Sequence, residues 1–415
     1  MSRTSPFNRH FIREQKRAAI LSEAAALFNV HGARATRLGD VAARLDLNPS
    51  SLYYYVNSKD ELIYQTYLES CETIGAMLDR AEAAGGTGAD HIAAFVRFYF
   101  EAWQAVAGGE RPHFAILTEI RGLRADHRKE IAGRYLAMFE RIVAFIEKGQ
   151  ADRSLRTDPP RDVALAVFGL VQMTVLWVHK LEPGQYDAAA EAFVDILLRG
   201  IAADRGACGA GARAGNVAGR AAAGAPAEKP AAFCSVACDY FNRKGFKGTS
   251  LDEIAERLDV SKGSFYHHVR DKDDLLRQCF QRSLALISEA QVCAADMRGN
   301  GLDRLLACAL DLFTVQNSAG GPLIRFNLIP SLAPRHQAAF RERLAGVSAA
   351  FGRFIREGIS DGSLRAVDPL VAEQMLLTAI DVSADLRRLR PTAGLDEAFS
   401  SYFGLYFRGL GGASR

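Results

Sequence analysis

The sequence predicts an all-α protein made of two tandem units, and three observations lead to that prediction. A stretch of 35 residues occurs twice, as Phe28–Leu62 and Phe241–Leu275, without a gap and with 15 identical positions. Apolar residues recur at helical spacing in both halves, and no convincing alternating pattern indicates strands. An Ala- and Gly-rich stretch with the composition of a flexible linker separates the halves.

The duplication extends beyond this stretch. Phe145–Gly149 leads into Asp152–Arg156, and Phe354–Gly358 leads into Asp361–Arg365 in the same way, 209 residues later. A whole unit of about 200 residues was therefore duplicated, which fits the usual size of a domain pair. We expect a head and a helical bundle in each unit, with these boundaries: 1–62 and 63–203, a linker at 204–229, then 230–276 and 277–412.

Composition limits the classes of function. The 415 residues are 49% hydrophobic and 24% charged, which is ordinary for a soluble globular protein. A net charge of +3 does not itself indicate a nucleic-acid partner, so such a partner has to be argued from local patches. Seven scattered Cys without CxxC spacing favour a reducing cytoplasm. The apolar stretch Val163–Val178 is short for a membrane span and indicates a buried helix instead.

Each copy of the repeat contains the signals of four successive helices. In the first copy, a helix over 16–30 ends at Gly32, and a short third helix covers about 49–56. The predicted N-caps of its second, third and fourth helices are Thr36, Asn48 and Ser58. In the second copy, Pro230 begins the first helix and Gly245 ends it, and the corresponding caps are Thr249, Ser261 and Asp271. Two short helices joined by a tight turn behind a longer one are typical of a helix-turn-helix.

A helix-turn-helix inserts its second short helix into the major groove while neighbouring groups hold phosphates. Tyr53 and Tyr266 offer hydroxyl donors for phosphate oxygens. Lys59 and Lys272 stand at the start of a helix, where unbonded backbone N–H groups also attract anions. Thr36 and Thr249 are expected to act similarly, through a hydroxyl and a cap N–H.

These residues resemble the TetR/AcrR family of bacterial regulators. The family pattern appears as Gly32, Thr36, Leu52–Val56 and Ser58–Leu62, and again as Gly245, Thr249, Phe265–Val269 and Asp271–Leu275. Two departures are that Tyr55 replaces a His that His268 keeps, and that Asp46 and Asp259 occupy a turn where Gly is common. The resemblance implies sequence-specific binding to double-stranded operator DNA, commonly repression, and a small-molecule effector that binds in the helical bundles.

The resemblance also implies a four-helix interface made by the last two long helices of each bundle. These would be about 161–180 and 187–202 in the first unit, and 369–388 and 395–410 in the second. The family member usually has one unit and pairs with a second chain. Here the simplest arrangement is an intramolecular pseudodimer, and the alternative is a homodimer in which only one head of each chain binds DNA.

The expected reading residues differ between the copies. The first offers Asn48, Pro49, Ser50, Ser51 and Tyr54, and the second offers Ser261, Lys262, Gly263, Ser264 and His267, with Tyr55 and His268 beside them. Lys262 can reach guanine acceptors, whereas Pro49 and Ser50 have little reach. We therefore expect two unlike half-sites. The basic N-terminal arm, with Arg3, Arg9 and Arg13, is either a minor-groove arm or a disordered tail.

Other chemistry has weaker support. Aromatic residues that either line an effector pocket or form plain core are Phe98, Trp103, Phe114, Trp177, Phe313 and Phe326. Arg325 is interpreted as a surface salt bridge rather than as the partner of an anionic ligand. His267 and His268 lack further ligands at helical spacing, so no metal is expected, and no cofactor motif is present. An enzyme would need a convergent acid–base, nucleophile or zinc set, and none is visible.

Overall fold

The computed structural model describes residues 9–117, 120–156, 158–206, 229–318, 321–386 and 394–412. These ranges are helical apart from turns, extended connections and two isolated β-bridges, and no strand occurs in them. The all-α prediction of two tandem units is confirmed. Most of the predicted linker and the first eight residues of the basic arm lie outside the described residues.

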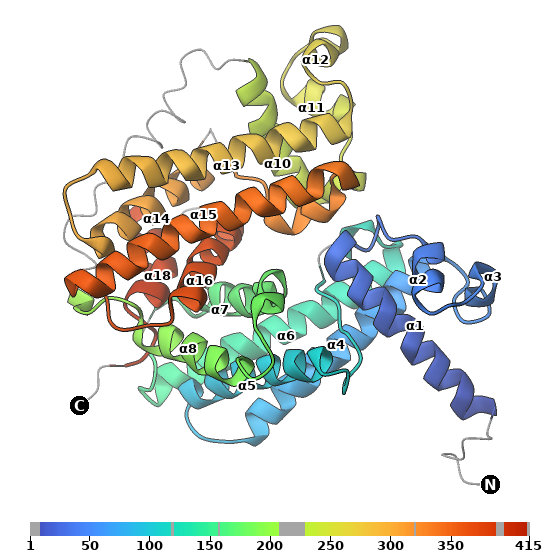
Figure 1. The fold of residues 1–415 in the computed structure, drawn as a ribbon, viewed down its shortest axis with the longest axis horizontal. Helices are drawn as coiled ribbons and strands as arrows, with labels where there is room; N and C mark the ends of the chain where they lie inside the picture. The colour runs from blue at the N-terminus through green and yellow to red at the C-terminus, as the bar shows by residue number, and fades with distance from the viewer. Residues whose placement is uncertain are drawn as a thin grey trace.

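The first unit contains a head and a bundle (Figure 1). Its helices are α1 (Arg9–His31), α2 (Leu38–Arg44), α3 (Pro49–Leu52), α4 (Lys59–Ala83), α5 (Gly88–Ala107), η1 (Ile120–Gly122), α6 (Ala125–Ala151), α7 (Pro160–Gln172), η2 (Met173–Leu176), η3 (Val178–Lys180) and α8 (Tyr186–Arg199). We call α1–α3 the first head. The long helix α4 runs from the head into the bundle, where it packs on α5 and α6.

The second unit repeats this order. Its helices are α10 (Lys229–Gly248), α11 (Leu251–Arg257), α12 (Lys262–His268), α13 (Lys272–Asp296), α14 (Gly301–Asn317), η5 (Phe326–Ser331), α15 (Pro334–Asp361), α16 (Pro369–Val382), η6 (Ser383–Asp385) and α18 (Leu395–Phe407). We call α10–α12 the second head. In Figure 1 the two heads lie away from the C-terminus, the second at the top and the first at the right.

Two predicted elements differ from the structure near the unit interface. The helix expected over 161–180 ends at Gln172 and continues as the 3₁₀ turns η2 and η3, and its counterpart α16 gives way to η6. The Thr174 hydroxyl donates to Val171 O at 2.8 Å, and the Ser383 hydroxyl donates to Ile380 O at 2.7 Å. A hydroxyl that bonds back to a carbonyl three residues earlier favours a tighter turn, which accounts for the same change in both units.

The two units meet through four helices. Helices α7 and α8 of the first unit pack on α16 and α18 of the second. The backbones of α7 and α16 come close because Gly169 has no Cβ, and one built there would lie 2.7 Å from Val382 Cγ1. A buried hydrogen bond joins Ser401 Oγ to Asp162 Oδ2 at 3.1 Å. These are the four segments that the family resemblance places at the interface.

The residues that follow the last helix of each unit pair with the backbone of the other unit. After α8, Ala202 pairs with Leu364 of the second unit, and after α18, Gly411 pairs with Leu155 of the first. The backbones of Gly200 and Gly409 cross at the centre, with φ of 69° and 78°. A Cβ on either would lie 2.4 Å from a backbone atom of the other unit. We call this pair of crossings the tail exchange.

Candidate nucleic-acid interface

The turn of each helix-turn-helix adopts the geometry that the sequence predicts. Asp46 and Asp259 both have φ of 53°, a left-handed conformation that Asp tolerates better than most residues. Asn48 caps α3 by accepting from Ser50 N at 3.0 Å, and Ser261 caps α12 by accepting from Ser264 N at 3.2 Å. The two recognition helices are therefore held at their first turn, as expected.

The recognition helix of the first head is shorter than predicted. Helix α3 ends at Leu52. The backbone N–H groups of Tyr54 and Tyr55 donate to Ser51 O and Leu52 O, which are i to i−3 hydrogen bonds of the 3₁₀ type and not α-helical ones. The Tyr53 and Tyr54 side chains remain 58% and 66% exposed. Exposed tyrosines in this position can reach a phosphate backbone.

Close to that helix lies a positive charge from the basic arm. The guanidinium of Arg13 sits over the ring of Tyr54, 5.0 Å from its centroid, a cation–π contact. Because Arg9 and Arg13 belong to α1, this part of the arm is helical and not a disordered tail. The arm thus places the cationic side chain of Arg13 beside the recognition helix.

The recognition helix of the second head is longer and carries different groups. Helix α12 keeps seven residues, with Tyr266 46% exposed and His267 exposed beside it. Lys262 Nζ lies 2.7 Å from Asp252 Oδ2, and this hydrogen bond raises the pKa of Lys262. His268 is half-buried with its ring edge against Phe233. Lys262 would have to leave Asp252 to reach a base.

The expected roles of Thr36 and Thr249 need correction. The N-caps of α2 and α11 are Arg37 and Ser250, one residue later than predicted. Each threonine is buried, and its hydroxyl donates to a glycine carbonyl: to Gly32 O, just after α1, at 2.9 Å, and to Gly245 O, where α10 is kinked, at 2.8 Å. The carbonyl groups at a helix end lack helical partners, so these hydroxyls serve the turn inside the head.

Lys59 and Lys272 each donate to the turn between the first two helices of their own head. Lys59 Nζ donates to Arg34 O, and Lys272 Nζ donates to Thr249 O at 2.9 Å. Burial, together with the charge of Lys247, lowers the pKa of Lys272. Both lysines are the first residues of long helices. Their ammonium groups therefore connect α4 and α13 to the heads, whatever further contact they make with DNA.

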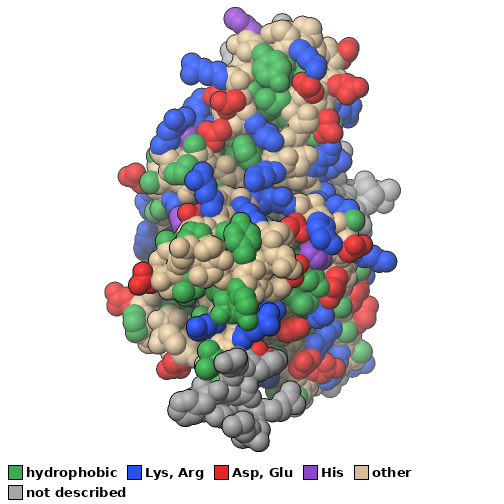
Figure 2. Space-filling view, turned by 90° about the vertical axis from the view of Figure 1, so that its right-hand side faces the viewer, with side chains coloured by type: hydrophobic (Ala, Val, Ile, Leu, Met, Phe, Trp, Pro, Cys, Tyr) green, Lys and Arg blue, Asp and Glu red, His purple; other side chains and the backbone are tan. Residues whose placement is uncertain are grey.

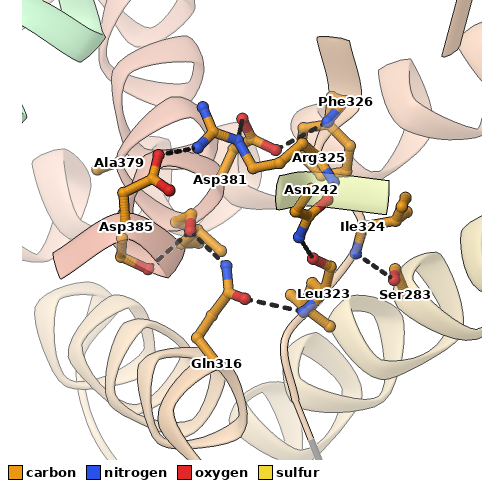
Figure 3. A network of polar contacts seen from close by, with 12 residues as sticks. Asn242, Ser283, Gln316, Leu323, Ile324, Arg325, Phe326, Ala379, Asp381 and Asp385 are labelled. Carbon is orange, nitrogen blue, oxygen red and sulfur yellow. Dashed lines mark hydrogen bonds and ion pairs between the residues drawn. The ribbon is translucent and has the colours of Figure 1, made fainter. Parts of the chain in front are cut away.

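Each head is tied to its bundle by an extended segment, which we call the strap: residues 114–116 in the first unit and 323–325 in the second. Asn242 Nδ2 in α10 donates to Leu323 O at 2.8 Å, and Arg325 N donates back to Asn242 Oδ1 at 3.0 Å (Figure 3). In the first unit, Asn29 forms the equivalent pair with Phe114 O and Ile116 N. Ser70 and Ser283 accept from the middle of the straps. Sequence reasoning missed these residues, although Asn29 and Asn242 are identical positions of the repeat.

The side chain of Arg325 gives the second strap an ion pair that the first lacks. Arg325 Nε donates to Asp381 Oδ2 at 2.9 Å, and Nη1 donates to Asp385 Oδ2 (Figure 3). Burial opposes the charge on Arg325, but the two carboxylates outweigh burial and hold its pKa above the usual value. The predicted surface salt bridge is thus wrong in its location, because the Arg325 and Asp381 side chains are only 11% and 2% exposed.

The aromatic pocket candidates fall into separate places. Phe98 lies under the guanidinium of Arg80 at 3.9 Å, near the surface. Trp103 and Phe114 pack on each other, and Phe313 packs between Phe399 and Phe403. Trp177 and Phe326 both line a cavity of about 110 Å³ between the units. An effector-binding role for these aromatic residues stays a prediction.

The region between the heads is rich in cationic side chains. Figure 2 views the side on which the heads lie, and Lys and Arg side chains spread across its middle. Arg121 donates to Arg243 O, and Lys247 Nζ approaches Arg34 O at 3.4 Å. These contacts join η1 and the turn between α1 and α2 of the first unit to α10 of the second unit. Cationic side chains gathered in this way suit contact with a phosphate backbone.

Among the residues that the structure describes, no group of three His, Cys, Asp or Glu side chains is placed to hold a metal ion. Within the same residues, no helix has the length and apolar character needed to cross a membrane.

Two helix-turn-helix heads on paired helical bundles define the class of the protein, a DNA-binding regulator. Comparison with known families matches residues 20–65 and 234–279 to the bacterial regulatory proteins of the tetR family, and 85–201 to a tetracyclin repressor-like C-terminal domain. The chain belongs to the tetR family of bacterial regulatory proteins, and it is a transcriptional regulator with two tandem units.

Individual relatives correspond to one unit each. The transcriptional repressor KstR2 of Rhodococcus jostii is 26% identical over 194 residues, which are 45% of this chain and 91% of that protein. The TetC protein of transposon Tn10 from Escherichia coli is 26% identical over 142 residues, 33% of this chain and 68% of that protein. The solved structure of the KstR2 regulator of Mycobacterium tuberculosis, 19% identical, covers 44% of this chain and 92% of its own, with a TM-score of 0.37.

Proposed function

We propose that one chain acts as a complete, ligand-responsive repressor, an intramolecular pseudodimer that binds an operator with two unlike half-sites. The observation that carries the proposal is the tail exchange together with the four-helix contact. Both are made within one chain, so the surface that would join two chains is already covered. Repression is taken from the name of the Rhodococcus relative, a transcriptional repressor.

The difference between the recognition helices supports unlike half-sites. In the first head, Asn48 and Ser50 hydrogen-bond to each other, through Asn48 Oδ1 and Ser50 Oγ at 2.8 Å, and Pro49 between them has no donor. In the second head, Lys262 and His267 are exposed and can donate to base edges. We propose that Tyr53 and Tyr266 contact phosphates on both half-sites, which fixes position without reading sequence.

Selection of bound duplexes from a random pool at one fixed salt concentration tests this function. We expect an enriched motif with two unlike halves, bound by one chain per duplex as measured by light scattering of the complex. A palindromic motif bound by two chains would contradict the pseudodimer and favour pairing through one kind of head. Absence of any enriched motif would contradict DNA binding itself.

Variants assign the two halves of the motif. Lys262→Ala should weaken selection in one half only, because only the second head carries a lysine there. Arg298→Ala is the control, since Arg298 is exposed in the loop between α13 and α14, at the end of α13 opposite the head. Equal loss in both halves with Lys262→Ala would mean that both half-sites are read by the same head.

A further inference from the structure

A pocket, which we call the inter-unit pocket, lies between the two units beside the cationic side chains of the heads. Its volume is about 290 Å³, close to the lower end of the range for small-molecule sites. The first unit contributes the turn of its head, the segment around η1, and α6 and α7. The second unit contributes the end of α10 and the strap at Arg325.

The lining of this pocket is strongly cationic. It contains one carboxylate, Asp385, and six cationic side chains: Arg34, Arg121, Arg243, Lys244, Lys247 and Arg325. Part of this charge is balanced, because Lys244 pairs with Glu253 at 2.6 Å, Arg243 pairs with Asp239 at 2.9 Å, and Arg325 pairs with Asp381 and Asp385. Lys247 Nζ donates to the backbone carbonyl of Arg34 at 3.4 Å. The field inside the pocket therefore favours an anion.

A buried donor lines the same pocket without a partner. Gln172, at the end of α7, is only 4% exposed, and its Nε2 makes no hydrogen bond. A buried amide N–H without a partner is costly, and such groups in native proteins are usually satisfied by a ligand or water. The equivalent residue of the second unit, Asp381, is fully engaged by Arg325 and by Phe326 N. Of these two equivalent residues, Gln172 has an unsatisfied donor and Asp381 does not.

Tyr135 adds a hydroxyl group to the lining. Its ring packs on Phe168 at 5.3 Å between centroids. Burial raises the pKa of Tyr135 to about 12, so its hydroxyl stays protonated at neutral pH. It is therefore able to donate to an anion.

We propose that the inter-unit pocket binds one small polyanion per chain, a ligand with phosphate or carboxylate groups, held by Lys247, Arg121 and Gln172. Its regulatory consequence rests on the proposed DNA-binding function. Arg34 from the turn of the first head and Gly245 from the turn of the second both reach the pocket. A ligand between them sets the distance between the heads, and so favours one of two operator affinities.

Calorimetric titration of the full chain with inorganic pyrophosphate, and separately with citrate, tests the binding step. Potassium chloride of equal ionic strength is the control. We expect one site per chain for at least one probe, and the tighter of the two identifies phosphate or carboxylate as the preferred group. Lys247→Ala and Gln172→Leu should each weaken binding at least tenfold, whereas Arg298→Ala should leave it unchanged.

Gln172→Leu keeps the experiment independent of folding defects. It replaces a buried donor without a partner by an apolar side chain of similar size, so its thermal midpoint without ligand should equal or exceed that of the parent. No binding of either probe, or binding that these substitutions leave unchanged, would overturn the proposal. So would a loss of operator affinity in Lys247→Ala without any loss of probe binding, because the lysine would then belong to the DNA surface.

The two proposals fail separately. If the chain selects an operator motif but binds neither probe, the inter-unit site is wrong and the DNA-binding function stands. If a probe binds at one site per chain but no motif is selected, the inter-unit site stands and the DNA-binding function is wrong. If both occur, we expect the tighter probe at saturation to change operator affinity at least fivefold.

Discussion

Arg325 is the residue where a single substitution most directly tests the structure of the second unit. It joins the strap at the head to Asp381 in the last turn of α16 and to Asp385 in η6. Replacing it by Ile leaves Asp381 buried, with Phe326 N as its main remaining donor, at 2.8 Å. Removing one partner of a buried ion pair costs about 3–5 kcal/mol because the other charge remains in a poor solvent. We expect the Arg325→Ile variant to lose that much apparent free energy of unfolding.

The first unit supplies a matched control for this variant. At the positions equivalent to Arg325 and Asp381 it carries Ile116 and Gln172. The double variant Arg325→Ile with Asp381→Gln copies that pair and removes the buried charge, so it should recover at least half of the loss. Urea unfolding followed by circular dichroism at 222 nm measures both variants.

Acid provides a second check. Burial raises the pKa of Asp381, while Arg325 and the Phe326 N–H oppose that rise. Without Arg325 this pKa rises further above its unfolded value. A carboxyl with a raised pKa destabilises the fold as pH rises through that pKa and does so less once it is protonated. The deficit of Arg325→Ile should therefore shrink as pH falls from about 7 towards 5. A loss below 1 kcal/mol, or a double variant no better than the single one, would refute the reasoning.

The remaining predictions concern the heads and the tail exchange. Tyr53→Phe and Tyr266→Phe should each weaken operator binding about 3- to 10-fold in fluorescence anisotropy, which corresponds to the net contribution of about 0.5–1.5 kcal/mol from one typical hydrogen bond, with an unchanged thermal midpoint because both rings are exposed. Lys262→Ala should reduce discrimination at one base pair by about 1–3 kcal/mol in competition binding, and an effect spread over the whole site would contradict base contact. Gly409→Ala should destabilise the chain more than Gly362→Ala in urea unfolding. Both have φ near 80°, but only the first places a Cβ 2.4 Å from backbone of the other unit. Equal losses of unfolding free energy would mean that the backbone crossing at Gly409 relaxes to make room for the added Cβ.

Local signals explain why the heads were predictable from the sequence. A glycine with positive φ, a capping Asn or Ser, and an Asp in a left-handed turn act over a few residues, and all appeared where the repeat placed them. The errors in the heads were also local. The sequence predicts Thr36 as an N-cap, but its hydroxyl donates instead to the carbonyl of Gly32, four residues earlier. The length of α3 depended on whether three tyrosines continue a helix, and periodicity does not decide that.

The sequence by itself determined the class: two copies of one helix-turn-helix pattern, each followed by amphipathic helices, can hardly specify anything but a tandem all-α regulator. Tertiary structure alone decided what joins the copies. The tail exchange at Gly200 and Gly409, the burial of Arg325 against Asp381, and the pocket at Gln172 each bring together residues far apart along the chain. Helical periodicity reports which face of a helix is buried, because burial repeats with the turn. It carries no record of which other helix covers that face, since apolar contact is non-directional and many partners satisfy it equally.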